Sequence, residues 1–161
     1  MTATFADYVA EQDARNTIQL NVTKWTLMLC DALKQNYIDH SIKSHTNSVL
    51  NSAPAEADPN SATFKYHVAC IVDLKNGECD YEFIIESGRK YHKIIMVIDN
   101  GHGRSPSRSV HAFVDRKTGE LYKSASWKSP AKGVRYDLRL IKDREYVLEN
   151  CDWSGGYLYA K

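Results

Sequence analysis

The chain has 161 residues, of which 43% are hydrophobic and 25% are charged, and its formal net charge is +1. This length and composition are those of one ordinary soluble globular domain, which buries a core without disulfides or metals. No apolar run approaches the roughly 18 residues of a membrane-spanning helix. Residues 1–15 carry acids where a signal peptide carries lysines, which predicts a cytosolic protein.

Two N-terminal segments have the apolar period of helices. Residues 4–14 place Phe5, Tyr8 and Val9 on one face. Residues 17–39 repeat apolar side chains at i, i+3, i+4 and i+7, with Asn16 or Thr17 as the N-cap. Residues 44–62, which are rich in Ser, Asn, Ala and Pro, are predicted as a loop or linker.

From residue 63 the pattern becomes that of strands. Five strands are predicted at 64–74, 79–86, 90–99, 109–115 and 120–125. Asn76-Gly77 is typical of a tight hairpin turn, and Cys70 and Cys79, which flank it, are interpreted as reduced cysteines. Because short turns join consecutive strands, we expect an antiparallel meander.

The C-terminal part is predicted to hold short elements. Ser129-Pro130 has the pattern of an N-cap and first turn, so a helix turn is expected over 130–136. A short helix is expected over 142–151 and an edge strand over 157–160. The predicted fold class is therefore α+β, with N-terminal helices on one face of an antiparallel meander of about five strands and a short C-terminal helix and strand. Residues 1–161 are predicted to form one domain, comprising a helical part (1–43), a loop (44–62) and a sheet region (63–161).

Charge is distributed unevenly along the chain. Residues 1–87 hold six basic and twelve acidic side chains, whereas residues 88–142 hold thirteen basic and four acidic ones, a net charge of +9. Such an asymmetry predicts a basic face that meets an anionic partner. The alternative is that acidic helices pack beside basic strands and their charges cancel.

The segment from Lys123 to Arg139 is the strongest candidate for that face. A helix that begins at Pro130 would direct unpaired N–H groups at an anion, and Trp127 could stack on a base. The alternative places Trp127 in the core and leaves the lysines as a solvated rim. Arg104 and Arg108 lie in the loop at 100–109 and are expected as further contacts. The predicted phosphate-binding residues are Lys117, Lys123, Trp127, Lys128, Lys132 and Arg135.

Catalytic signals are weak. The sequence lacks the usual nucleotide-binding loops, a nucleophile motif and a carboxylate cluster. We therefore predict no cofactor or metal, and we favour a non-enzymatic role. An enzyme that used His111 or Tyr122 would need both in one pocket with a basic residue. Spacing along the predicted strand puts His111 and Phe113 on one face.

Three segments carry a resemblance to a known group: GRKYHKIIMV, SVHAFVDRKTGELYKSASWKSPAKGVRYDL and DWSGGYLYA. They resemble small, mostly uncharacterised bacteriophage proteins that share HAFVD, KTGE, YK, ASWK, PAKGVRY and a closing Trp-Gly-Tyr tail. The resemblance covers roughly residues 80–161 and implies a phage or prophage origin without an activity.

Together these observations predict a small, non-enzymatic phage accessory protein of the host cytoplasm. Its basic face would bind nucleic acid or a nucleotide-like molecule. The alternative is an interaction module that targets a host protein or assembly, or a component of the virion.

Overall fold

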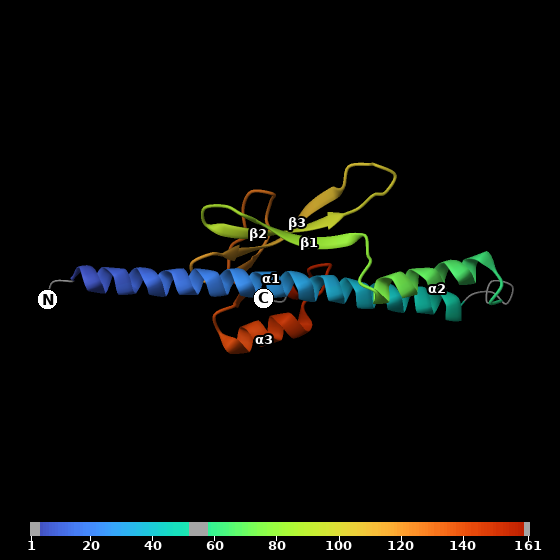
Figure 1. Ribbon diagram of the computed structural model, residues 1–161, viewed down its shortest axis with the longest axis horizontal. Coiled ribbons are helices and arrows are strands. Elements are labelled where there is room, and N and C mark those ends of the chain that lie inside the picture. The colour runs from blue at the N-terminus through green and yellow to red at the C-terminus, as the bar shows by residue number, and fades with distance from the viewer. Residues whose placement is uncertain (1–3, 52–57, 160–161) are drawn as a thin grey trace.

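The computed structural model describes residues 4–51 and 58–159. It is an α+β structure in which one long helix crosses a five-stranded antiparallel sheet, and the predicted fold class is confirmed (Figure 1). None of the helices in these residues has the length and apolarity needed to cross a membrane. The elements in chain order are α1 (Phe5–Leu50), α2 (Ala62–Lys75), β1 (Tyr81–Ser87), β2 (Tyr91–Ile98), β3 (Ser107–Asp115), β4 (Glu120–Lys123), β5 (Tyr136–Asp137), α3 (Ile141–Asn150) and the 3-10 turn η1 (Gly156–Leu158).

The core lies between the middle of α1 and one face of the sheet. Val22, Leu29 and Leu33 of α1 have no exposed surface and share a cluster with strand residues such as Ile94 and Val114. Val147 places α3 against the same cluster. Side chains alternate along a strand, so the sheet has two faces: a helix-covered face that packs on α1, and an opposite, outer face.

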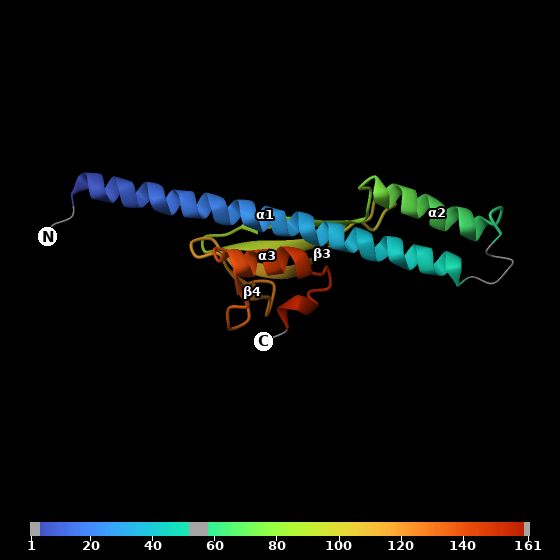
Figure 2. The same ribbon diagram turned by 90° about the horizontal axis from the view of Figure 1, so that it is seen from below.

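The first turns of α1 extend beyond the sheet. In both ribbon views no other element lies beside this part of the helix (Figures 1 and 2). Its large apolar side chains are exposed accordingly, with 80% of Phe5 and 71% of Leu20 accessible. We call residues 5–21 the arm.

The two N-terminal helices predicted from the sequence are one helix. It begins with a capping box, in which Thr4 accepts a hydrogen bond from the Asp7 amide and Asp7 accepts one from the Thr4 amide. Thr17, predicted as a cap, lies inside the helix, where its hydroxyl donates to the Asp13 carbonyl at 2.9 Å. The loop predicted from residue 44 is wrong as far as residue 50, because α1 continues to Leu50; residues 52–57 lie outside the described structure.

The first predicted strand is wrong, because residues 62–75 form α2. Ser61 caps this helix by accepting a hydrogen bond from the Phe64 amide at 3.1 Å. The aromatic and β-branched residues alternate as in a strand, but the same stretch also has helical spacing. The α2 side chains that lose exposure are Phe64, His67, Cys70, Ile71 and Leu74. The Asn76-Gly77 pair is a helix C-terminus rather than a hairpin, with Gly77 at φ +82°.

The remaining strands form the predicted meander, in the order β1-β2-β3-β4-β5. Four of them were expected. The fifth, β5, was not expected, and it pairs Tyr136 with Leu121. The helix turn predicted at 130–136 is wrong, because residues 130–135 form no helix and β5 begins at Tyr136. Gly119 turns β3 into β4 at φ +73°, where an added Cβ would lie 3.1 Å from Arg139 Cγ and 3.4 Å from Val22 Cγ2.

A β-bulge in β3 changes which face His111 occupies. The pairing of β2 with β3 shifts between Ile94↔Ala112 and Ile95↔Val110, which leaves His111 as the extra residue. His111 therefore packs against Phe83 on the helix-covered face, whereas Phe113 packs against Tyr91 on the outer face. The prediction that His111 and Phe113 share a face is wrong for this reason.

The C-terminal helix is confirmed as α3, but the edge strand predicted at 157–160 is not formed by the described residues. Residues 156–158 make the turn η1 instead. The Asp152 carboxylate fixes this turn by accepting from the Gly156 and Tyr157 amides at 3.2 and 3.1 Å. The turn closes the end of the sheet near His111, since Tyr157 Oη lies 2.8 Å from His111 Nε2.

Candidate functional site

The outer face of the sheet carries a cluster of cations around one exposed tryptophan. Trp127 is 42% exposed, and Lys93 Nζ and Arg108 Cζ lie 4.9 and 5.6 Å from its ring centre. Lys93 also lies 5.8 Å from the ring centre of Phe113. Both distances to Trp127 are within the range of cation–π attraction.

A depression of about 310 Å³ adjoins this cluster. Its rim combines the β1–β2 turn with β2 and the loop after β4, and Phe113 lies in its floor. Glu86 is the acidic residue that lines it, and this carboxylate forms an ion pair with Arg108. We call the whole region the outer basic surface; it comprises Arg89, Lys90, Lys93, Arg108, Trp127 and Lys128.

The loop that presents Trp127 is held by its own backbone. The amides of Ala125 and Ser126 both donate to the Ser129 carbonyl at 3.1 Å. The Ser126 hydroxyl accepts from the Ser129 amide at 3.2 Å. A tight turn of this kind needs no apolar anchor at its tip, so Trp127 projects from it without being drawn into the core.

The predicted anion site at a helix N-terminus does not exist. Pro130 lies in an isolated β-bridge with Ser124, and the Ala131 amide donates to the Lys123 carbonyl at 2.7 Å. The Arg135 amide donates to the Leu121 carbonyl at 2.8 Å. These N–H groups complete the sheet beside β4 and are not directed at an anion.

The structure divides the predicted phosphate ligands among several places. Trp127 and Lys128 belong to the outer basic surface. Arg108, which was predicted in the loop at 100–109, joins them from strand β3. Lys123 lies on the opposite, helix-covered face, with Nζ 4.4 Å from the ring centre of Tyr159. The other three predicted ligands are exposed in separate loops. Lys117 lies in the β3–β4 turn, Lys132 in the loop after β4 and Arg104 in the β2–β3 loop.

Arg135 has a structural role in the described chain. Its Nε donates to the Leu158 carbonyl at 2.7 Å, and Nη1 donates to the Gly133 and Lys132 carbonyls at 3.0 and 3.3 Å. The guanidinium thereby ties η1 to the loop before β5. These three backbone carbonyls orient the guanidinium, and fewer of its N–H donors remain for a phosphate.

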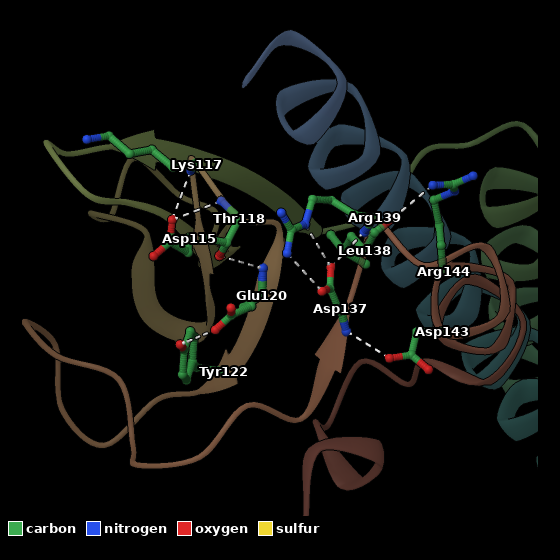
Figure 3. Close-up of polar contacts among 10 residues, drawn as sticks. All are labelled: Asp115, Lys117, Thr118, Glu120, Tyr122, Asp137, Leu138, Arg139, Asp143 and Arg144. Atoms are coloured by element: carbon green, nitrogen blue, oxygen red, sulfur yellow. Dashed lines mark hydrogen bonds and ion pairs between the residues drawn. The ribbon is translucent and has the colours of Figure 1, made fainter. Parts of the chain in front are cut away.

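The acidic residues near β4 and β5 are used to build turns (Figure 3). Asp115 accepts from the Lys117 and Thr118 amides at 2.9 and 3.2 Å, while the Lys117 ammonium points away from it. Asp137 pairs with Arg139 at 3.2 Å. These carboxylates are engaged in local structure, and no group of three or more potential metal ligands occurs among residues 4–51 and 58–159.

The enzyme alternative required His111 and Tyr122 in one pocket, and the sheet separates them. Tyr122 lies on the outer face near Tyr91, and its hydroxyl donates to Glu120 at 2.7 Å. Burial and this bond raise the pKa of Tyr122 to about 12. His111 lies on the other face, where burial lowers its pKa to about 4. That specific pairing is therefore excluded.

Sequence reasoning missed Lys93, Lys90 and Arg89 as members of the site. Alternation along β2 was the available signal, because Tyr91, Lys93 and Ile95 occupy one side of that strand. The contact between Lys93 and Trp127 joins segments more than thirty residues apart, so spacing alone does not predict it.

One comparison with known proteins gives a result. A family of unknown function, DUF7717, matches residues 5–160. The chain belongs to this family. The DUF7717 match spans both the helices and the sheet, whereas the resemblance predicted from the sequence covered only the C-terminal half. No curated protein and no solved structure matches the chain.

Proposed function

We propose that this protein is a small phage-encoded accessory protein that binds single-stranded nucleic acid through the outer basic surface. The observation that carries the proposal is the exposed Trp127 ring with Lys93 and Arg108 beside it. A flat aromatic ring can stack on a base while neighbouring cations neutralise the phosphates on either side of that base. The phage origin rests on the sequence resemblance.

The depression supports the same proposal. Lys93 and Lys128 line it together with Arg89 and Lys90, and its acidic member is already paired with Arg108. The local balance is therefore positive, although the whole chain has a net charge of only +1. Such a field attracts a phosphate backbone without needing a defined base sequence.

Fluorescence anisotropy with a labelled oligothymidylate tests the proposal. Binding should weaken with salt, with a log–log slope of about −0.7 for each phosphate contacted. The double variant Lys93→Met/Lys128→Met should lower both the affinity and the slope. Its matched control is Lys117→Met/Lys132→Met, which removes the same charge from exposed sites outside the surface and should leave the slope almost unchanged.

Trp127→Ala separates stacking from charge. We expect it to cost about 1–3 kcal/mol of binding free energy without changing the salt slope. Salt-independent binding, or equal losses in the two double variants, would contradict the proposal.

A protein-interaction module is the second candidate, and the arm favours it. An isolated helix is marginal in water, and this one exposes Phe5, Tyr8 and Leu20 by 80%, 58% and 71%. A host or virion protein that covers the arm would explain that exposure. Affinity capture from infected cells should then recover one stoichiometric protein, and Phe5→Lys/Leu20→Lys should abolish its recovery without lowering oligothymidylate binding.

A further inference from the structure

A second hollow lies on the other side of the sheet from the outer basic surface. It has a volume of about 300 Å³, at the lower end of the range for small-molecule sites. Strands β3 and β4 form one wall, and the C-terminal segment around η1 forms the other. The residues that matter to its chemistry are Ser109, His111, Lys123, Trp153 and Tyr159.

The charge that lines this hollow is positive. Lys123 is the charged residue in its lining, and no carboxylate belongs to the described residues that line it. The nearest acid in the C-terminal segment is Asp152, whose oxygens already accept from the amides of Ser154, Gly156 and Tyr157. An anion that enters the hollow therefore meets a cation without a competing free carboxylate.

His111 supplies a second donor. Its Nε2 lies 2.8 Å from the Tyr157 hydroxyl, which has no other hydrogen-bond partner among the described residues. If that hydroxyl donates to Nε2, the neutral imidazole carries its proton on Nδ1. Nδ1 makes no hydrogen bond within the described structure, and no buried polar side-chain atom there lacks a partner. It follows that Nδ1 is not fully buried, and His111 belongs to the lining of the hollow.

Two aromatic rings shape the walls. Trp153 is fixed from behind by its amide, which donates to Asn36 Oδ1 at 3.0 Å, and by edge contacts to Tyr37 and Tyr81 at 5.4 and 5.7 Å. Tyr159 is 68% exposed and lies over the Lys123 ammonium at the mouth. One wall is therefore held by several contacts, whereas the other is an exposed ring at the mouth.

From this arrangement we infer that the hollow is a binding site for a small anion that carries an aromatic ring. Lys123 and His111 Nδ1 bind the anionic group, and the ring lies between Trp153 and Tyr159. The site does not depend on the proposed nucleic-acid surface, because Lys93 and Trp127 lie on the opposite face of the sheet.

Phenyl phosphate is a suitable probe, because it contains both features in a ligand of suitable size. In a ¹H–¹⁵N titration we expect the amides of Ser109, Ser124 and Gly155 to shift, with a dissociation constant in the millimolar range or lower. Inorganic phosphate lacks the ring and phenol lacks the charge, so each should bind at least about threefold more weakly than phenyl phosphate.

Variants test the individual roles. Lys123→Met keeps the length of the side chain and should weaken phenyl phosphate binding about tenfold or more, whereas the matched control Lys117→Met should not change it. Tyr159→Leu, at an exposed position that the fold tolerates, should weaken binding several-fold. Its folding is checked in the same spectra.

The inference is overturned if phenyl phosphate shifts only amides near Lys93 and Trp127, or none up to about 10 mM. It is also overturned if phosphate and phenyl phosphate bind equally well. Neither result bears on oligothymidylate binding, which would fail separately if the outer basic surface were wrongly assigned.

Discussion

On the helix-covered face of the sheet the side chains are mostly apolar and enclosed by α1, whereas on the outer face every strand from β1 to β4 also carries charge. Ile94 and Leu121 on the first face have no exposed surface. Glu86, Lys93 and Arg108 represent the second. The same strands thus supply a core on one side and a charged surface on the other, because alternate residues point in opposite directions. His111 is one of the polar residues on the covered side, and it shows that a single bulged residue can change the face that a side chain occupies.

The largest expected effect comes from truncating the covered face. Ile94→Ala should lower the free energy of unfolding by about 2–5 kcal/mol, because it leaves a cavity against α1. Ile84→Ala makes the same chemical change on the outer face, where the side chain is 41% exposed, and should cost less than about 1.5 kcal/mol. Urea denaturation measures both, and equal losses would contradict the division into two faces.

The next effect concerns pH. Burial holds the pKa of His111 at about 4 in the folded chain, below its ordinary value of 6.5. The folded state therefore favours neutral His111, and its contribution is fully present above about pH 6.5 and lost as the pH falls towards 4. The full change is on the order of 3 kcal/mol.

Comparison of wild type with His111→Phe isolates this contribution. Between pH 6.5 and 4, the free energy of unfolding of the variant should fall less than that of the wild type. Some fall in stability should remain in the variant, because burial and nearby Arg116 also lower the pKa of His92. Identical pH profiles for the two proteins would show that His111 is not protonation-sensitive.

A smaller effect is expected at Arg135. Arg135→Met removes the bonds to the Leu158, Gly133 and Lys132 carbonyls and should cost about 1–3 kcal/mol of stability. Lys132→Met, three residues away and exposed, should cost less than about 0.5 kcal/mol. Thermal unfolding measures both, and a neutral Arg135→Met would return this side chain to the set of candidate phosphate ligands.

The smallest effect on global stability is expected at the start of α1. Thr4→Ala removes the hydrogen bond that the Thr4 hydroxyl accepts from the Asp7 amide, but residues 5–21 make no part of the buried core. The free energy of global unfolding should change by less than about 0.5 kcal/mol, while helix content by circular dichroism falls slightly. A large global loss would show that the arm packs against something.

Periodicity predicted the fold class, α1 over 17–39, α3 and four of the five strands. It failed for α2, because Phe64, Tyr66 and Val68 suit a strand as well as a helix, and only packing against α1 decides between them. It failed at Pro130, where sheet hydrogen bonds from the Ala131 amide outweighed a local helix signal.

The candidate site was predicted only in part. Trp127, Lys128 and Arg108 were found from charge and composition, but Lys93 joins them through the register of β2 with β3. The position of His111 depends on a bulge, and a bulge has no reliable signature in a single sequence. Those contacts depend on tertiary pairing that the one-dimensional pattern does not contain.

The capped helix α1 has one continuous set of backbone hydrogen bonds, yet these bonds are protected to very different degrees. Around Leu29 and Leu33, a backbone amide exchanges with solvent deuterium only when the sheet separates from α1. Between Tyr8 and Ile18, fraying of the helix from its N-terminus is enough for exchange. Exchange rates along this helix should therefore form a gradient of several orders of magnitude with no break in secondary structure. Any ligand of the arm would be detectable as the flattening of that gradient.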